Sequence, residues 1–210
     1  MYTRTPARSR TLALTLLAST LLTTTGVSAN IVAFDFDTAE GGFELMPDMV
    51  APGISSSLWS DTDGNLSNVS GNPGLAASAR GFDDGNAMTF SLSLPTGVTL
   101  AISDVAFDQR ASSSGPTGWA LAINGVTVAS GATTTTFGHI LESVTLPSIS
   151  GVADFVLSGL GAASASGTWR VDNFEVSGAL MTQPVPVPAA LVLLTSSIAG
   201  LVGLRGLGRV

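Results

Sequence analysis

The stretch "DTDGNLSN" places oxygen-bearing side chains at alternate positions of a loop. Asp61, Asp63 and Asn65 stand at its first, third and fifth positions, which is the opening spacing of a calcium-binding loop. Leu66 and Asn72 stand where an EF-hand has Gly and Glu, so the EF-hand is excluded. The spacing therefore indicates an irregular calcium site, with ordinary turn formation as the alternative.

Catalytic chemistry has few residues to draw on. His139 is the only histidine, and the chain contains neither lysine nor cysteine. His139 lies where a loop meets a strand in "TTTTFGHILES", and we expect it to face solvent without a partner. Glycoside hydrolysis requires two positioned carboxylates. The acid pairs available are Asp35 with Asp37, Asp61 with Asp63, and Asp83 with Asp84. Solvent exposure or cation binding explains these pairs more simply than catalysis does, so we predict no catalytic residue.

Three tryptophans could each offer a face on which a sugar ring stacks. Trp119 and Trp169 lie in alternating apolar patterns, which favour packing in the core. Trp59 lies in the polar stretch "SSSLWSDTDGN" and is the candidate for glycan stacking, with core packing as the alternative.

Charge is distributed unevenly along the 210 residues. All 15 acids lie between Asp35 and Glu175, where three arginines oppose them, so this segment has a net charge of −12. Binding to a nucleic acid backbone depends on clustered Lys and Arg, so nucleic acid is excluded as a partner. Divalent cations and neutral glycans fit this charge better. Without cysteine there is no disulfide, and an exported domain must be stable through its core alone.

Apolar residues alternate with polar ones from Ile31 onward, as in half-buried strands. "AMTFSLSL" places Met88, Phe90 and Leu92 on one face. "VTLAISDVAF" changes phase at Ser103 and Asp104, which predicts a bulge there. "WALAINGVTV" predicts a hairpin that turns at Asn124 and Gly125. No stretch between Asn30 and Gly178 has helical periodicity. The prediction is an all-β fold, an antiparallel β-sandwich of seven to ten strands similar to a jelly roll.

Both ends of the chain predict export. Residues 1–29 contain three arginines, an apolar stretch and small residues that end at Ala29, which is typical of a secretory signal peptide cleaved there. At the other end, residues 189–204 are apolar; as a helix they would be roughly 24 Å long, close to the hydrocarbon thickness of a bilayer. Arg205 and Arg209 follow and place the C-terminus on the cytoplasmic side. Residues 30–180 then form one exported domain, and residues 181–210 form a tail with a single transmembrane helix.

The tail "VPVPAALVLLTSSIAGLVGLRGLGRV" resembles the C-terminal sorting signal of the PEP-CTERM class in its VPxPA variant. The motif that carries the resemblance precedes the apolar run and the basic end, and it consists of Val185, Pro186, Val187, Pro188 and Ala189. The resemblance implies recognition by an exosortase of Gram-negative bacteria, export through the Sec machinery, a transient inner-membrane anchor, and final placement at the cell surface or in the extracellular medium. Proteins of this class are associated with exopolysaccharide and biofilm.

The exported domain is similar to the jelly-roll domains that accompany this signal, on the stretches "FDQRASSSGPTGWAL" and "GTWRVDNFEVSG". Jelly-roll carbohydrate-binding modules often hold a structural calcium ion between their terminal strands. That resemblance implies a second calcium site, in which Asp172 pairs with Asp35, Asp37 or Glu40 of the first strand region.

These patterns together predict a non-enzymatic, exported β-sandwich protein of the surface or matrix. Its role is structural or glycan-associating, with exopolysaccharide as a partner and calcium as the one candidate cofactor. The alternative is a secreted polysaccharide-active enzyme, a hydrolase or lyase, on a jelly-roll fold.

Overall fold

The structure, a computed structural model, describes residues 28–38 and 42–182, and every regular element among them is a β-strand. The alternation in the sequence explains these strands. Strand β7 (Ala87–Ser93) buries Met88, Phe90 and Leu92 and turns Thr89 and Ser91 away from the core. The prediction of an all-β fold is confirmed for these residues.

The larger of two sheets has eight strands. Its order is β11–β8–β14–β1–β2, with β12 paired to β8, β6 paired to β14, and β5 paired to β6. These strands are β1 (Ala29–Phe34), β2 (Met49–Val50), β5 (Ser67–Ser70), β6 (Leu75–Arg80), β8 (Val98–Ala111), β11 (Gly138–Ser143), β12 (Ile149–Ser150) and β14 (Thr168–Thr182). The long strands β8 and β14 pair along most of their length and form the centre of the sheet.

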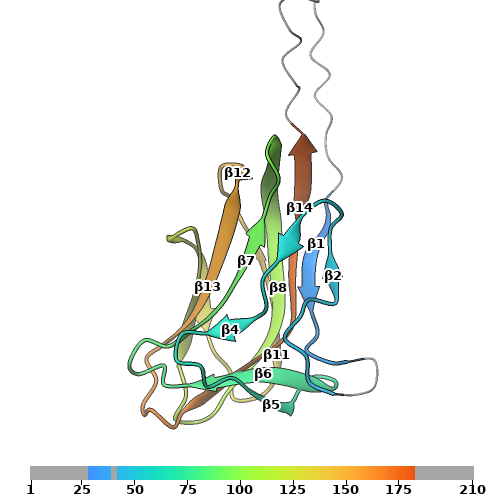
Figure 1. Ribbon diagram of the computed structural model, residues 1–210. Helices are drawn as coiled ribbons and strands as arrows, with labels where there is room; N and C mark the ends of the chain where they lie inside the picture. The colour runs from blue at the N-terminus through green and yellow to red at the C-terminus, as the bar shows by residue number, and fades with distance from the viewer. Residues whose placement is uncertain (1–27, 39–41, 183–210) are drawn as a thin grey trace, which may run out of the picture.

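The smaller sheet has six strands in the order β10–β9–β13–β7–β3, and β4 also pairs with β7. Its other strands are β3 (Ser55–Ser56), β4 (Ser60–Asp61), β9 (Gly118–Ile123), β10 (Val126–Ala132) and β13 (Val152–Leu160). Neighbouring strands run antiparallel, and the chain crosses repeatedly from one sheet to the other. Figure 1 shows the two layers face to face. This is the antiparallel β-sandwich that the sequence predicts.

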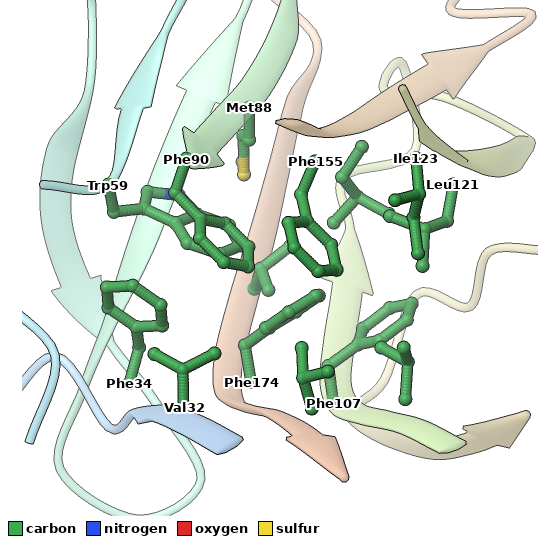
Figure 2. Packing of buried hydrophobic residues seen from close by; sticks show 14 of the residues in the cluster. Val32, Phe34, Trp59, Met88, Phe90, Phe107, Leu121, Ile123, Phe155 and Phe174 are labelled. Carbon is green, nitrogen blue, oxygen red and sulfur yellow. The ribbon is translucent and has the colours of Figure 1, made fainter. Parts of the chain in front are cut away.

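An aromatic cluster fills the space between the sheets (Figure 2). Phe90 and Phe155 stack with ring centroids 4.4 Å apart. Trp59 lies 4.9 Å from Phe174 and 5.2 Å from Phe34, with both contacts edge to face. Because rings from both sheets and from the segment before β4 meet here, the cluster fixes the distance between the layers.

Two local predictions are confirmed. Asn124 and Gly125 both have positive φ, 49° and 76°, as the two-residue turn between β9 and β10 requires. In the pairing of β8 with β14, Ser177 faces Asp104 and Gly178 faces Ile102. Ser103 is therefore the extra residue of a β-bulge, at the place where the hydrophobic pattern changes phase.

The predicted signal peptide up to residue 27, the predicted sorting motif and the predicted transmembrane helix at 189–204 lie outside the described residues, as does Glu40. Ala29, the predicted cleavage residue, is the first residue of β1. No helix long and apolar enough to cross a bilayer is found within the described ranges.

Candidate functional site

Three carboxylates from distant parts of the chain gather around the turn between β5 and β6. Asp108 and Asp172 face each other across β8 and β14, and Asp37 reaches the same turn from the segment after β1. We call Asp37, Asp108, Asp172 and residues 71–75 the acidic turn. Of its carboxylates, the sequence analysis singled out Asp172 and offered Asp37 as one of three partners. It missed Asp108, which carries no local signal.

Backbone amides hold the Asp172 carboxylate in place. Its Oδ2 accepts from the Asn72 N–H at 2.6 Å, and its Oδ1 accepts from the Asn173 N–H at 2.9 Å. Asn173 has a positive φ of 48° at a bulge between β14 and β8. Its Nδ2 donates to the Asn72 carbonyl at 3.0 Å and to Asp108 Oδ2 at 3.1 Å. The two asparagines therefore tie the turn to both central strands.

Two glycines allow the turn to approach the carboxylates closely. A Cβ on Gly71 would collide with Asp172 Oδ2 and with the Leu75 backbone, and a Cβ on Gly74 would collide with the Asp37 carboxylate. Asp37 Oδ1 in turn accepts from the Leu75 N–H at 2.9 Å. The sequence "GNPGL" is therefore fitted to the acids that surround it.

Burial raises the pKa of Asp172 to about 6, because the charged carboxylate loses hydration. The N–H groups of Asn72 and Asn173 oppose that effect, whereas the charges of Asp108 and Asp37 add to it. The side chain is 0% exposed. Near neutral pH, the structure thus holds a deprotonated acid in surroundings that disfavour its charge.

His139 has a partner that the sequence analysis did not anticipate. Its Nδ1 lies within hydrogen-bond distance of Asp108 Oδ1, at 2.8 Å. The prediction of a solvent-facing ring is confirmed, because 63% of the side chain is exposed, but the prediction that it has no partner is wrong. The reason is register, since β11 pairs His139 directly with Asp108 of β8.

The loop with Asp61, Asp63 and Asn65 is closed by its own hydrogen bonds. Asp61 accepts from the N–H groups of Asn65 and Leu66 and from Asn86 Nδ2. Asn65 Oδ1 accepts from the Arg80 N–H at 3.0 Å. The structure does not bring this loop together with Asp35 or Asp172. It shows the turn chemistry that was the alternative for these residues.

Asp35 faces Asp48 rather than Asp172. The Asp35 N–H donates to Asp48 Oδ2 at 2.7 Å, and Asp35 Oδ1 accepts from the Asp37 N–H at 2.8 Å. Burial raises the pKa of Asp48 above its ordinary value, and the neighbouring Asp35 carboxylate contributes in the same direction. Of the partners suggested for Asp172, Asp37 is the one beside the acidic turn.

The fit of calcium to the acidic turn is partial. In charge the turn suits a cation, because three carboxylates meet there and none of them forms a salt bridge with an arginine within the described residues. In geometry the oxygens point at N–H donors, and within residues 28–38 and 42–182 no group of three or more acidic or histidine side chains is arranged to hold a metal ion. A bound calcium would require Asp37 or Asp108 to turn toward Asp172.

The prediction that Trp59 offers a stacking face is wrong. The side chain is 1% exposed and packs among Phe34, Phe36, Phe90 and Phe174. Its polar neighbours in sequence suggested an exposed ring, but the chain turns inward for this one residue. Trp119 and Trp169 are buried as predicted, and Trp169 donates to Gln109 at 3.0 Å.

A polar groove crosses the outer face of the six-stranded sheet. It has a volume of about 360 Å³, and its lining comes from β4, β7, β13 and the segment between β3 and β4: Ser57, Ser60, Thr89, Phe90, Ser91, Asp154, Phe155 and Val156. Ser60 and Thr89 hydrogen-bond through their hydroxyls at 2.9 Å. Asp154 is exposed and stands opposite Ser91 in the pairing of β13 with β7. We call this the hydroxyl groove. It offers hydroxyls and one carboxylate to a ligand, with no basic side chain.

No family model and no curated protein matches this sequence. Among solved structures, the chain is similar to the carbohydrate-binding module CBM36 in complex with calcium and xylotriose, with 18% identity and a TM-score of 0.36 over 57% of this chain and 99% of that one. It is also similar to TmCBM61 in complex with β-1,4-galactotriose, with 17% identity and a TM-score of 0.37 over 63% and 90%. A family two carbohydrate esterase from Cellvibrio japonicus matches at 10% identity, with a TM-score of 0.37 over 77% and 37%. At these identities the similarity concerns the fold, an antiparallel β-sandwich.

Proposed function

We propose that this chain is an exported, non-enzymatic β-sandwich protein that associates with neutral glycan at the cell surface or in the extracellular matrix. The hydroxyl groove is the observation that carries the glycan part. Its Ser and Thr hydroxyls can donate to and accept from sugar hydroxyls, and Asp154 can accept from two neighbouring hydroxyls of one ring. Because all three tryptophans are buried, binding relies on these polar contacts rather than on stacking.

The glycan is neutral in this proposal because the groove has no basic side chain and the domain has only three arginines that could pair with uronates, sulfates or phosphates. Between Asp35 and Glu175, fifteen acids face three arginines. An acidic polysaccharide would be repelled at low salt. A neutral exopolysaccharide carries no such penalty.

Titration with xylotriose, β-1,4-galactotriose and cellohexaose tests this proposal. Replacement of Asp154 by Ala removes charge-assisted hydrogen bonds, and we expect about a tenfold loss of affinity. Asp84→Ala is the matched control, since it removes another exposed carboxylate, in the loop between β6 and β7, that does not line the groove. Equal affinity of the two variants would contradict the groove as the site. Shortening of the oligosaccharides would instead favour the alternative, a polysaccharide-active enzyme.

The sorting part of the proposal rests on the tail sequence. An exosortase would cut at the motif Val185–Ala189 and leave the mature protein at the surface or free outside the cell. Mass spectrometry of the mature protein should then find a C-terminus near Pro188. A mature surface protein that retains Val210 would contradict processing.

Calcium at the acidic turn is the cofactor in this proposal, supported by the charge concentrated there. Millimolar calcium should raise the melting temperature of the full chain and not that of an Asp172→Asn variant, because a ligand that binds only the folded state stabilises it. No shift in either protein would contradict a calcium site there.

A further inference from the structure

The two ends of the sandwich differ in charge. At the end where β1 begins and β14 finishes, the connecting segments are residues 51–54, 94–97, 124–125 and the single residue 151. Pairing of Thr182 with Val98, and of Val152 with Ser93, places these segments together, at the top of Figure 1. We call this the exit end. None of these segments, nor Met181 or Thr182, contains a charged residue.

The opposite end carries the acids. Asp35 and Asp37 follow β1, and Asp83 and Asp84 connect β6 to β7. Asp61, Asp63, Asp108 and Asp172 belong to the same end, together with Arg80, Arg110 and Arg170. The long axis of the sandwich therefore runs from an uncharged surface to a strongly acidic one.

Apolar side chains are exposed at the exit end. Val126 is 54% exposed, Val152 is 46% exposed, and Met181 is 39% exposed. A hollow of about 360 Å³ opens beside them, lined by Gly53, Ile54, Ser55, Ser93, Leu94 and Pro95. Three of the seven large apolar side chains exposed within the described residues therefore lie at this end beside uncharged segments, and such a surface suits an interfacial environment.

We propose that the exit end is a membrane-facing surface, which rests on the phospholipid bilayer while the tail anchors the chain. The inference depends on the proposed anchor at residues 189–204. Strand β14 finishes at Thr182, and the six residues before Ala189 can span at most about 20 Å. An anchored domain therefore holds its exit end near the bilayer.

Electrostatics selects the same orientation. An anionic bilayer repels carboxylates within about a Debye length of its surface. Tilting the domain would bring its acidic end toward the headgroups, whereas among the described residues the one exposed carboxylate beside the exit end is that of Asp154, next to the turn at Asn124. Exposed Val and Met side chains gain by entering the interface between headgroups and acyl chains. The surface also lacks charges that would select a particular protein partner.

Site-specific labelling of the full chain tests this orientation. Because the chain has no cysteine, single variants Val152→Cys at the exit end and Ser166→Cys in the loop between β13 and β14 can carry an environment-sensitive dye. The proteins are reconstituted in vesicles of phosphatidylethanolamine and phosphatidylglycerol that contain a spin-labelled quencher lipid. We expect quenching at position 152 to exceed quenching at position 166 by about threefold.

A charge placed at the exit end should abolish the difference. Val126→Asp combined with the label at 152 should reduce quenching to the level seen at 166, whereas Ala163→Asp, an exposed position at the opposite end, should leave it unchanged. If the chain floats with the vesicles but the dye is quenched equally at positions 152 and 166, the proposed orientation is overturned and the anchor is not. Chain that fails to float overturns the anchor in the proposed function and this inference with it.

Discussion

Asp172 is a buried acid with two carboxylate neighbours and no contacting cation. Its pKa in the folded state, about 6, lies above its ordinary value of 3.8. A folded protein with such a group binds the proton more tightly than the unfolded chain does. The stability that this proton contributes is complete below pH 3.8 and is lost as the pH rises through 6.

We therefore expect the fold to become more stable when the pH is lowered from 7.5 to 5. Between these two pH values the effect is about 1.4 kcal/mol in the free energy of unfolding, or a rise in melting temperature of about 4 °C, because the full effect of about 3 kcal/mol is reached only below pH 3.8. Replacement of Asp172 by Asn should flatten this dependence, and Asp84→Asn should not. Thermal melts across this pH range measure the effect. If the melting temperature of the Asp172 variant depends on pH as steeply as that of the unchanged chain, other groups cause the pH dependence.

Trp59 and Leu58 are neighbours with opposite environments, 1% and 55% exposed. Trp59→Ala should cost about 4 kcal/mol in the free energy of unfolding, because it removes the ring that joins β1, β7 and β14 in the core. Leu58→Ala should change it by less than about 0.5 kcal/mol. Denaturant unfolding distinguishes the two, and a small loss for Trp59→Ala would mean that this ring is not a core residue.

Strands, hairpin and bulge could be predicted from the sequence because each is encoded locally. The turn at Asn124 and the phase change at Ser103 need only a few adjacent residues to be recognised. The acidic turn could not be predicted in full, because its contacts join residues about a hundred positions apart, such as Asn72 with Asp172. Asp108 became part of it only through the register of β8 with β14.

The turn between β5 and β6 gives a prediction at the level of one element. Gly74 and Gly64 both have positive φ, 76° and 65°, so alanine strains the backbone at either position by about 1 kcal/mol. Around Gly64 the space is open, whereas a Cβ at Gly74 meets the Asp37 carboxylate. Gly74→Ala should therefore lower the free energy of unfolding by about 2 kcal/mol more than Gly64→Ala does. Equal losses in chemical denaturation would show that the turn can move away from Asp37.

Across the whole molecule, the folding of the chain separates three surfaces that are mixed along the sequence. Eight acids gather at one end, the uncharged segments gather at the other, and the hydroxyl groove with Asp154 lies on the outer face of one sheet. Sequence composition alone predicts the net charge but not this separation, because it depends on which strand ends meet.

The net charge of residues 35–175 sets a prediction for the full chain. With fifteen acids, three arginines and no lysine between Asp35 and Glu175, the domain repels polyanions at a distance. The full chain in detergent should not be retained on immobilised alginate at low salt. Its affinity for a neutral oligosaccharide should change by less than about twofold when salt is raised, because hydrogen bonds to uncharged sugars are not screened. Retention on alginate that falls steeply with salt would contradict a neutral glycan as the ligand. It would require a cationic binding site, although the described residues offer only three separate arginines.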